Sequence, residues 1–179
     1  MSYLGSYKFE EHIEGAEGSK AGLKYMIWIG NTDKSREEFM EYFNQDTYMQ
    51  ELEALESGRT KKRPNPEHRC QFCKDIEIKY YYPEFLTVKM LDHLEDPFTL
   101  VREMIDNKYV PDWPIEYDIK KYKPGMANCI VCYIPNGCKD KKKNQKIFIR
   151  KKDYSDHGKY VNELDSYNGI GYLQSFKAE

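Results

Sequence analysis

The sequence predicts an α+β protein with a mostly antiparallel sheet and two or three helices packed on it. Residues 25–29 form an uncharged apolar run that leads through a glycine turn into an acidic, amphipathic segment, which is typical of a buried strand followed by a helix. Further helical segments come next, and a succession of strands ends the chain. This order favours antiparallel pairing over repeated strand–helix–strand units.

The chain is expected to contain one folded domain, because 179 residues suffice to bury one core. Residues 1–22 are predicted to be an appendage, flexible or docked on the main body, since residues 14–22 are small or charged and bury little surface. Residues 23–179 form the α+β domain, and its first strand spans about 24–29.

A helix is predicted to follow the first strand. Ser35 and Glu38 have the spacing of a capping box, in which each side chain bonds the other residue's backbone N–H. The apolar spacing continues over 35–55. Asp46 and Thr47 can interrupt it, so two shorter helices are an equal alternative.

The middle of the chain alternates loops with regular segments. Gly58 is expected to cap the preceding helix, and the basic, proline-containing residues 59–69 form a loop. Residues 70–73 are a short helix or a turn. Alternating apolar and polar side chains predict a strand over 76–82, and apolar residues at helical spacing predict a helix over 84–94.

The last third of the chain is predicted to supply most of the sheet. Asp96 followed by proline indicates the start of a helix, and residues 110–114, with two prolines, indicate an irregular connection. Residues 128–134 form the strongest buried strand. An Asn-Gly turn and a lysine-rich tip are expected to join it to a strand over 146–150 as an antiparallel hairpin. A final strand spans 170–176.

Charge is divided along the chain although the net charge is only −2. The segment from Asp33 to Glu56 contains eight acidic and two basic residues. The segment from Lys139 to Lys152 contains eight basic residues and one acidic residue. The small net charge disfavours general attraction to nucleic acid or membranes. No apolar stretch approaches the ~20 residues that span a bilayer. Without a visible export signal, the five cysteines are expected to be reduced thiols in the cytoplasm.

Two Cys-x-x-Cys pairs, Cys70/Cys73 and Cys129/Cys132, raise a metal hypothesis because tetrahedral zinc takes four thiolate or imidazole ligands. The second pair lies in an apolar strand, where residues three apart face opposite sides of the sheet. We therefore interpret the cysteines as small buried hydrophobes and keep a metal-binding module as the alternative. A redox role is disfavoured, because neither pair is predicted to lie between a strand and a helix N-terminus.

A nucleic-acid-binding module is the other alternative, since basic residues 59–69 and 139–152 accompany tyrosines that can stack on bases. The near-neutral net charge disfavours nucleic acid as a partner. The sequence contains no phosphate-binding loop, dinucleotide fingerprint, nucleophile elbow or zinc-protease motif, so no catalytic residues and no cofactor are predicted.

Carboxylates on the first predicted helix and directly before it offer a different role. Asp33, Glu37, Glu38 and Glu41 are spaced at about one helical turn. Such an array can present negative charge to a basic, phosphate-binding cleft on another protein. A solvated outer helix face is the alternative interpretation.

Several blocks of the sequence also resemble a known family. They cover residues 25–43, 70–85, 128–134 and 169–176. Together they are similar to the immunity protein 22 family of bacterial polymorphic toxin systems, over about residues 24–176. Trp28, Gly30 and Asp75 match positions typical of that family. Tyr81 begins a block that in the family reads Tyr-Asp-x-Asp, and this chain has lost one of its acidic positions.

The resemblance implies an α+β protein that binds and neutralises a toxin domain, often a nuclease. The expectation is therefore a cytoplasmic immunity protein without enzymatic activity, whose partner is the cognate toxin protein. Asp33, Glu37, Glu38 and Glu41 are the predicted toxin-binding residues. Trp28 is expected in the core, and Asp75 is expected to have either a structural role or a contact with the toxin. The sequence does not indicate the oligomeric state.

Overall fold

The computed structural model of the chain describes residues 22–147 and 170–179. A four-stranded sheet in the order β2-β3-β1-β4 runs through it, and neighbouring strands are antiparallel throughout. The α+β class with an antiparallel sheet is therefore confirmed. The strands are β1 (Lys24–Gly30), β2 (Leu86–Glu95), β3 (Ala127–Tyr133) and β4 (Ile170–Lys177). The prediction for residues 1–22 lies almost wholly outside the described residues.

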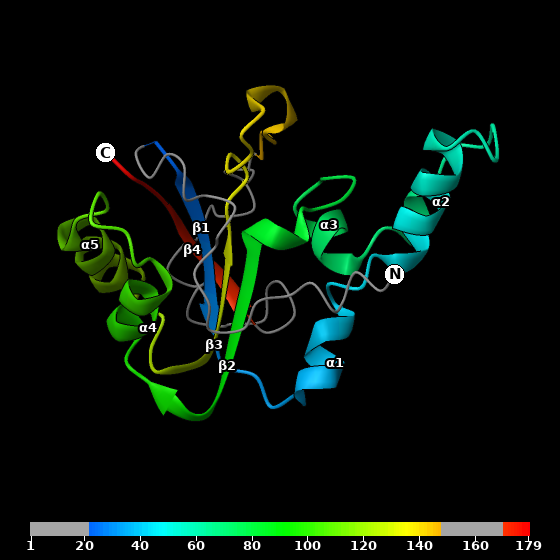
Figure 1. Cartoon of the computed structure of the whole chain (residues 1–179). Helices are drawn as coiled ribbons and strands as arrows, with labels where there is room; N and C mark the ends of the chain where they lie inside the picture. The colour runs from blue at the N-terminus through cyan, green and yellow to red at the C-terminus, as the bar shows by residue number, and fades with distance from the viewer. Residues whose placement is uncertain (1–21, 148–169) are drawn as a thin grey trace.

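Helices lie on both sides of the sheet, with α1, α2 and α3 towards one side and α4 and α5 towards the other (Figure 1). The α-helices are α1 (Arg36–Glu41), α2 (Asp46–Glu56), α3 (Gln71–Asp75), α4 (Pro97–Met104) and α5 (Asp112–Tyr122). Short 3-10 helices are η3 (Pro66–His68), η4 (Pro83–Phe85) and η5 (Lys141–Lys143). The two central strands, β1 and β3, are buried along nearly their whole length. Both faces of the sheet therefore need to be covered by helices.

The register assigns side chains to the two faces, since residues directly opposite each other in a sheet share a face. Trp28 lies opposite Val131 and packs edge-on against Phe72 of α3, with ring centroids 5.4 Å apart. The neighbouring positions on β1 point to the other face. There the Tyr25 hydroxyl accepts a hydrogen bond of 2.8 Å from Asn107, which lies between α4 and α5.

Local start signals in the sequence mark real helix boundaries. Ser35 and Glu38 form the predicted capping box at the start of α1. That helix ends at Glu41 and α2 begins at Asp46, so the alternative with two shorter helices is the correct one. Asp96 caps α4 by accepting a hydrogen bond of 3.0 Å from the Thr99 N–H, as its position before proline predicts.

Two predictions in the middle of the chain are wrong. Residues 84–94 form mostly strand β2, because β3 has a free edge there and β2 pairs with it. The apolar spacing fits a helix, but Leu86 and Val88 alternate with Thr87 as a strand requires. Residues 76–82 contain no strand. Both backbone polar groups of Tyr81 bond the side-chain amide of Gln45, which takes the place of a neighbouring strand.

Two further differences concern the last third. Helix α5 was not predicted, yet Pro114 lies in its first turn, where a missing N–H breaks no intrahelical bond. The hairpin between residues 128–134 and 146–150 is not formed as predicted. Strands β1 and β2 occupy both edges of β3, and residues 144–147 are irregular, while residues 148–150 lie outside the described residues.

Candidate functional site

Acidic side chains gather at one end of the sheet. Both β1 and β2 are antiparallel to β3, so they run in the same direction and finish at the same end (Figure 1). Gly30 and Met90 accordingly lie on either side of Cys129. The carboxylates lie at the end of β2 and in the segments that directly follow β1 and β2, including α1. We call this surface the acidic end and define it by Asp33, Glu37, Glu38, Glu41, Asp92, Glu95 and Asp96.

The β1–α1 connection is held in place by a side chain from β3. The Asn128 amide nitrogen donates to the Thr32 carbonyl at 2.8 Å, and the amide oxygen accepts from the Thr32 N–H at 2.9 Å. Thr32 is therefore fixed to the sheet immediately before Asp33. A side chain that satisfies both backbone groups of a turn residue replaces the water that would otherwise bind them.

Helix α1 presents Glu37, Glu38 and Glu41, and the connection before it presents Asp33, so all four predicted toxin-binding residues are exposed near this helix. Glu38 has a structural task, because its carboxylate accepts a hydrogen bond of 2.8 Å from the Ser35 N–H. That bond lowers the pKa of the Glu38 carboxyl below its ordinary value, so the charge is retained. Glu41 accepts a hydrogen bond of 3.2 Å from the Asn44 amide. Asp33 and Glu37 complete the array.

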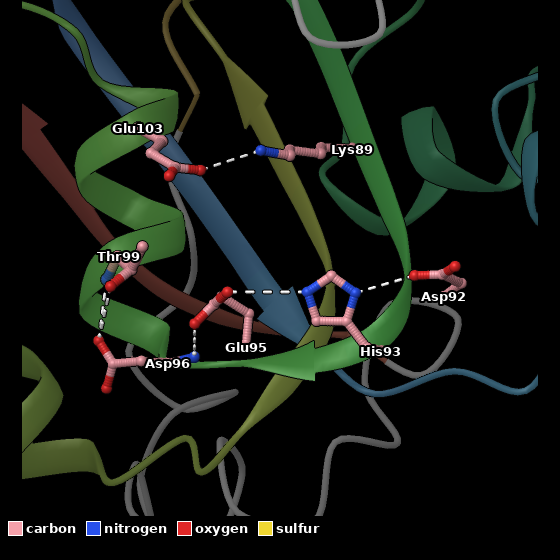
Figure 2. Close-up of polar contacts among 7 residues, drawn as sticks. All are labelled: Lys89, Asp92, His93, Glu95, Asp96, Thr99 and Glu103. Carbon is pink, nitrogen blue, oxygen red and sulfur yellow. Dashed lines mark hydrogen bonds and ion pairs between the residues drawn. The ribbon is translucent and has the colours of Figure 1, made fainter.

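The second part of the acidic end comes from an irregularity in β2. Pairing with β3 resumes only at Glu95 opposite Ala127, so residues 91–94 leave the ladder and Asp92 and His93 are exposed (Figure 2). His93 Nδ1 lies 2.8 Å from an Asp92 oxygen and Nε2 lies 3.7 Å from a Glu95 oxygen. The hydrogen bond to Asp92 raises the pKa of the His93 imidazole and lowers the pKa of the Asp92 carboxyl.

Sequence reasoning missed this second group because it placed residues 84–94 on a helix. Three carboxylates and a histidine within residues 92–96 were the available signal. A neighbouring ion pair fixes the strand before them: Lys89 Nζ lies 3.0 Å from a Glu103 oxygen on α4 (Figure 2). The acidic end is thus supported by both helical layers.

The family-motif positions lie away from this surface or beneath it. Trp28 is fully buried, and Gly30 ends β1 between its neighbours on β3 and β4. Tyr81 is fully buried, and its hydroxyl donates to the Phe43 carbonyl at 2.6 Å. Burial raises the pKa of the Tyr81 hydroxyl far above its ordinary value. Asp75 accepts hydrogen bonds from the Tyr42 hydroxyl and from the Gln71 amide and so ties α3 to α1.

The structure separates the two cysteine pairs. Cys129 shares a face with Trp28, and Cys132 points to the opposite face because it is three residues along the same strand. Within residues 22–147 and 170–179, no three His, Cys, Asp or Glu side chains gather as a possible metal site. Cys70 is the N-cap of the five-residue helix α3, which follows the 3-10 helix η3, so the first pair lies at the start of a helix but not between a strand and a helix.

A second exposed surface lies on α5, on the other side of the sheet. Trp113 and Tyr117 are 66% and 60% exposed and stand four residues apart, on one helix face. The Lys121 ammonium lies 5.9 Å from the centre of the Tyr117 ring. The sequence analysis did not identify this exposed face because it did not predict helix α5. No helix in the described part of the chain combines the length and apolarity that crossing a membrane requires.

Comparisons with known proteins provide no family assignment. No protein-family model matches the chain, and no curated protein or solved structure matches it either.

Proposed function

We propose that this chain is a cytoplasmic immunity protein that binds a cognate bacterial toxin domain and neutralises it by occlusion. The observation that carries the proposal is the acidic end, where the end of β2 and the segments that follow β1 and β2 expose carboxylates at the same end of the sheet. The resemblance of residues 24–176 to an immunity family supports the same conclusion. The proposed mechanism is stoichiometric binding, without chemistry on the toxin.

Charge complementarity explains how such a surface would act. A nuclease toxin binds a polyanion and therefore needs a basic cleft, to which fixed carboxylates are an electrostatic counterpart. Asp33 and Glu37 are exposed and follow the turn that Asn128 holds. Because the backbone is already ordered, less conformational freedom is lost on binding. An interface of standard size would bury about 1,600 Å² in total and cover such a cleft.

The direct test of the function is protection in cells. The proposal predicts that a protein with a toxic C-terminal domain is encoded beside this protein's gene. That domain is expressed in bacteria with and without the chain, and survival is measured. We expect protection and a complex that copurifies at a fixed ratio. An unrelated toxin domain serves as the control and should not be neutralised. If cells die equally with and without the chain and no complex forms, the proposed function is wrong.

A further inference from the structure

Helix α5 exposes two large aromatic side chains on its outer side. Trp113 and Tyr117 are 66% and 60% exposed, and Ile115, between them in the sequence, is fully buried. At about 3.6 residues per turn, the two aromatic residues therefore lie on one side of α5, and Ile115 lies on the opposite, buried side. Aromatic side chains are enriched at protein interfaces, because each can bury about 150–250 Å². The outer side of α5 is consequently suited to contact with another protein chain.

The start of α5 is held in place by Arg102 on α4. The Arg102 guanidinium donates hydrogen bonds to the carbonyls of Val110 at 2.7 Å and Asn107 at 3.2 Å, and to that of Ile105. The same group pairs with Asp112, the first residue of α5, at 3.0 Å. The outer side of α5 is therefore ordered before any partner binds, which reduces the conformational entropy lost on association.

Two charged side chains share this side of the helix. Glu116 lies about one turn after Trp113, Lys120 lies about one turn after Tyr117, and both charged residues are exposed. We call the surface formed by Trp113, Glu116, Tyr117 and Lys120 the α5 face. Its carboxylate is nearer the start of the helix, and its ammonium group is nearer the end. In an antiparallel pair of α5 helices, Glu116 of each copy therefore approaches Lys120 of the other copy.

We propose that the α5 face is the contact surface of a homodimer, in which the α5 helices of two copies pack antiparallel about a twofold axis. A twofold axis brings the same surface of both copies together, so that surface must be complementary to itself. The α5 face meets this condition, because the rotation places its carboxylate opposite its ammonium group and places aromatic rings of both copies in the contact. The Glu116 carboxylate disfavours a polyanion such as nucleic acid as the occupant.

The size of the α5 face determines the strength of the dimer. Helix α5 has 11 residues and is about 16 Å long, which is short for an interface of standard size that buries about 1,600 Å². We therefore expect a weak dimer that forms only at high protein concentration. Helix α1 lies on the other side of the sheet from α5, so the dimer leaves both acidic ends uncovered (Figure 1). The inference does not depend on the proposed function and is tested without the toxin.

Sedimentation equilibrium of the full chain over a range of protein concentrations tests the proposal. We expect a monomer at low micromolar concentration and an increasing fraction of dimer towards millimolar concentration. Trp113→Ala should weaken the association at least about tenfold, because aromatic residues at the centre of an interface carry much of its affinity. Glu56→Lys, at an exposed position on α2, is the control and should associate as the wild type does. All the substituted residues are exposed, so the variants should fold.

Exchange of the two charges distinguishes the twofold dimer from other contacts. Glu116→Lys and Lys120→Glu should each weaken self-association at least about threefold at low salt. An equimolar mixture of these two variants should associate again, because their α5 faces are complementary, and an effect within one helix cannot produce this recovery. A chain that stays monomeric at every concentration would overturn the proposal. So would a dimer that Trp113→Ala leaves unchanged, or a mixture that associates no better than the single variants.

Discussion

The side-chain amide of Asn128 bonds both backbone polar groups of Thr32, donating to its carbonyl at 2.8 Å and accepting from its N–H at 2.9 Å. These residues are 96 positions apart in the chain. The contact fixes the end of β1 to the start of β3 just before the carboxylates of α1. The position of the α1 part of the acidic end thus depends on this amide group in the sheet.

Replacing Asn128 by alanine should destabilise the protein by about 1–2 kcal/mol, because two partly buried backbone groups lose their partner. Urea denaturation followed by circular dichroism measures the change. Asn31→Ala is the matched control, since Asn31 is exposed in the same connection. Equal stability of the two variants would show that the Asn128 contact has no role in holding the turn.

Gln45 is a second side-chain amide that bonds both backbone groups of a distant residue, in this case Tyr81. It is a stronger test because its side chain is only 1% exposed. Gln45→Ala should cost about 2–3 kcal/mol of stability, since it leaves a buried donor and a buried acceptor unpaired. Gln50→Ala, an exposed position on α2, should change the stability by less than about 0.5 kcal/mol. Thermal and urea unfolding of both variants provide the measurement.

These long-range amide contacts explain where sequence reasoning succeeds and fails. The apolar runs of β1 and β3 and the caps at Ser35 and Asp96 are local signals, and the elements that they predict are present. The strand expected over 76–82 fails because Gln45, far away in the sequence, satisfies the backbone of Tyr81. Partners that are remote in the sequence leave no local pattern to read.

The candidate site likewise contains one group of residues with a local sequence signal and another without one. The carboxylates of α1 could be selected from the sequence because the capping box defines which residues lie on the helix. The group around His93 could not, because its exposure results from the irregular pairing of β2 with β3. The exposed Trp113 and Tyr117 were missed for another local reason, namely that proline in the first turn disguised helix α5.

Gly137 should not tolerate a side chain. A Cβ atom at this position would lie 2.6 Å from a carbon of the Phe85 ring, well inside van der Waals contact. Gly137→Ala should therefore destabilise the protein by about 1–3 kcal/mol through overpacking. Chemical denaturation of the single variant and of Gly137→Ala with Phe85→Leu provides the check. If the double variant is no more stable than Gly137→Ala alone, a clash with the Phe85 ring is not the cause of the destabilisation.

The pKa of the His93 imidazole should report the negative charge of the carboxylates next to it. Its folded-state pKa is raised above the ordinary 6.5, chiefly by the hydrogen bond to Asp92. The stability that this pair contributes is therefore complete below about pH 6.5 and is lost as the pH rises through the folded-state pKa. NMR of the imidazole should give a midpoint above 6.5, which falls in Asp92→Asn and at high salt. A wild-type midpoint at or below 6.5 would contradict the observed geometry.

The exposed aromatic face of α5 should not contribute to toxin binding, which the acidic end provides. Trp113 is 66% exposed, so Trp113→Ala should leave the stability within about 0.5 kcal/mol of the wild type. Because α5 lies on the other side of the sheet from α1, the variant should also bind the toxin domain normally. Calorimetry of the variant with the toxin domain tests this, and a large loss of affinity would move the interface to α5.

Association kinetics with the toxin domain test the central claim most directly. Reversing Glu37 and Glu41 to lysine spares the capping contact of Glu38, and reversing Glu56 and Glu116, both exposed elsewhere, makes the same change in net charge. We predict that the first variant associates at least about tenfold more slowly at low salt and that the second is nearly unaffected. Equal association rates for the two variants, at low and high salt, would contradict binding through the acidic end.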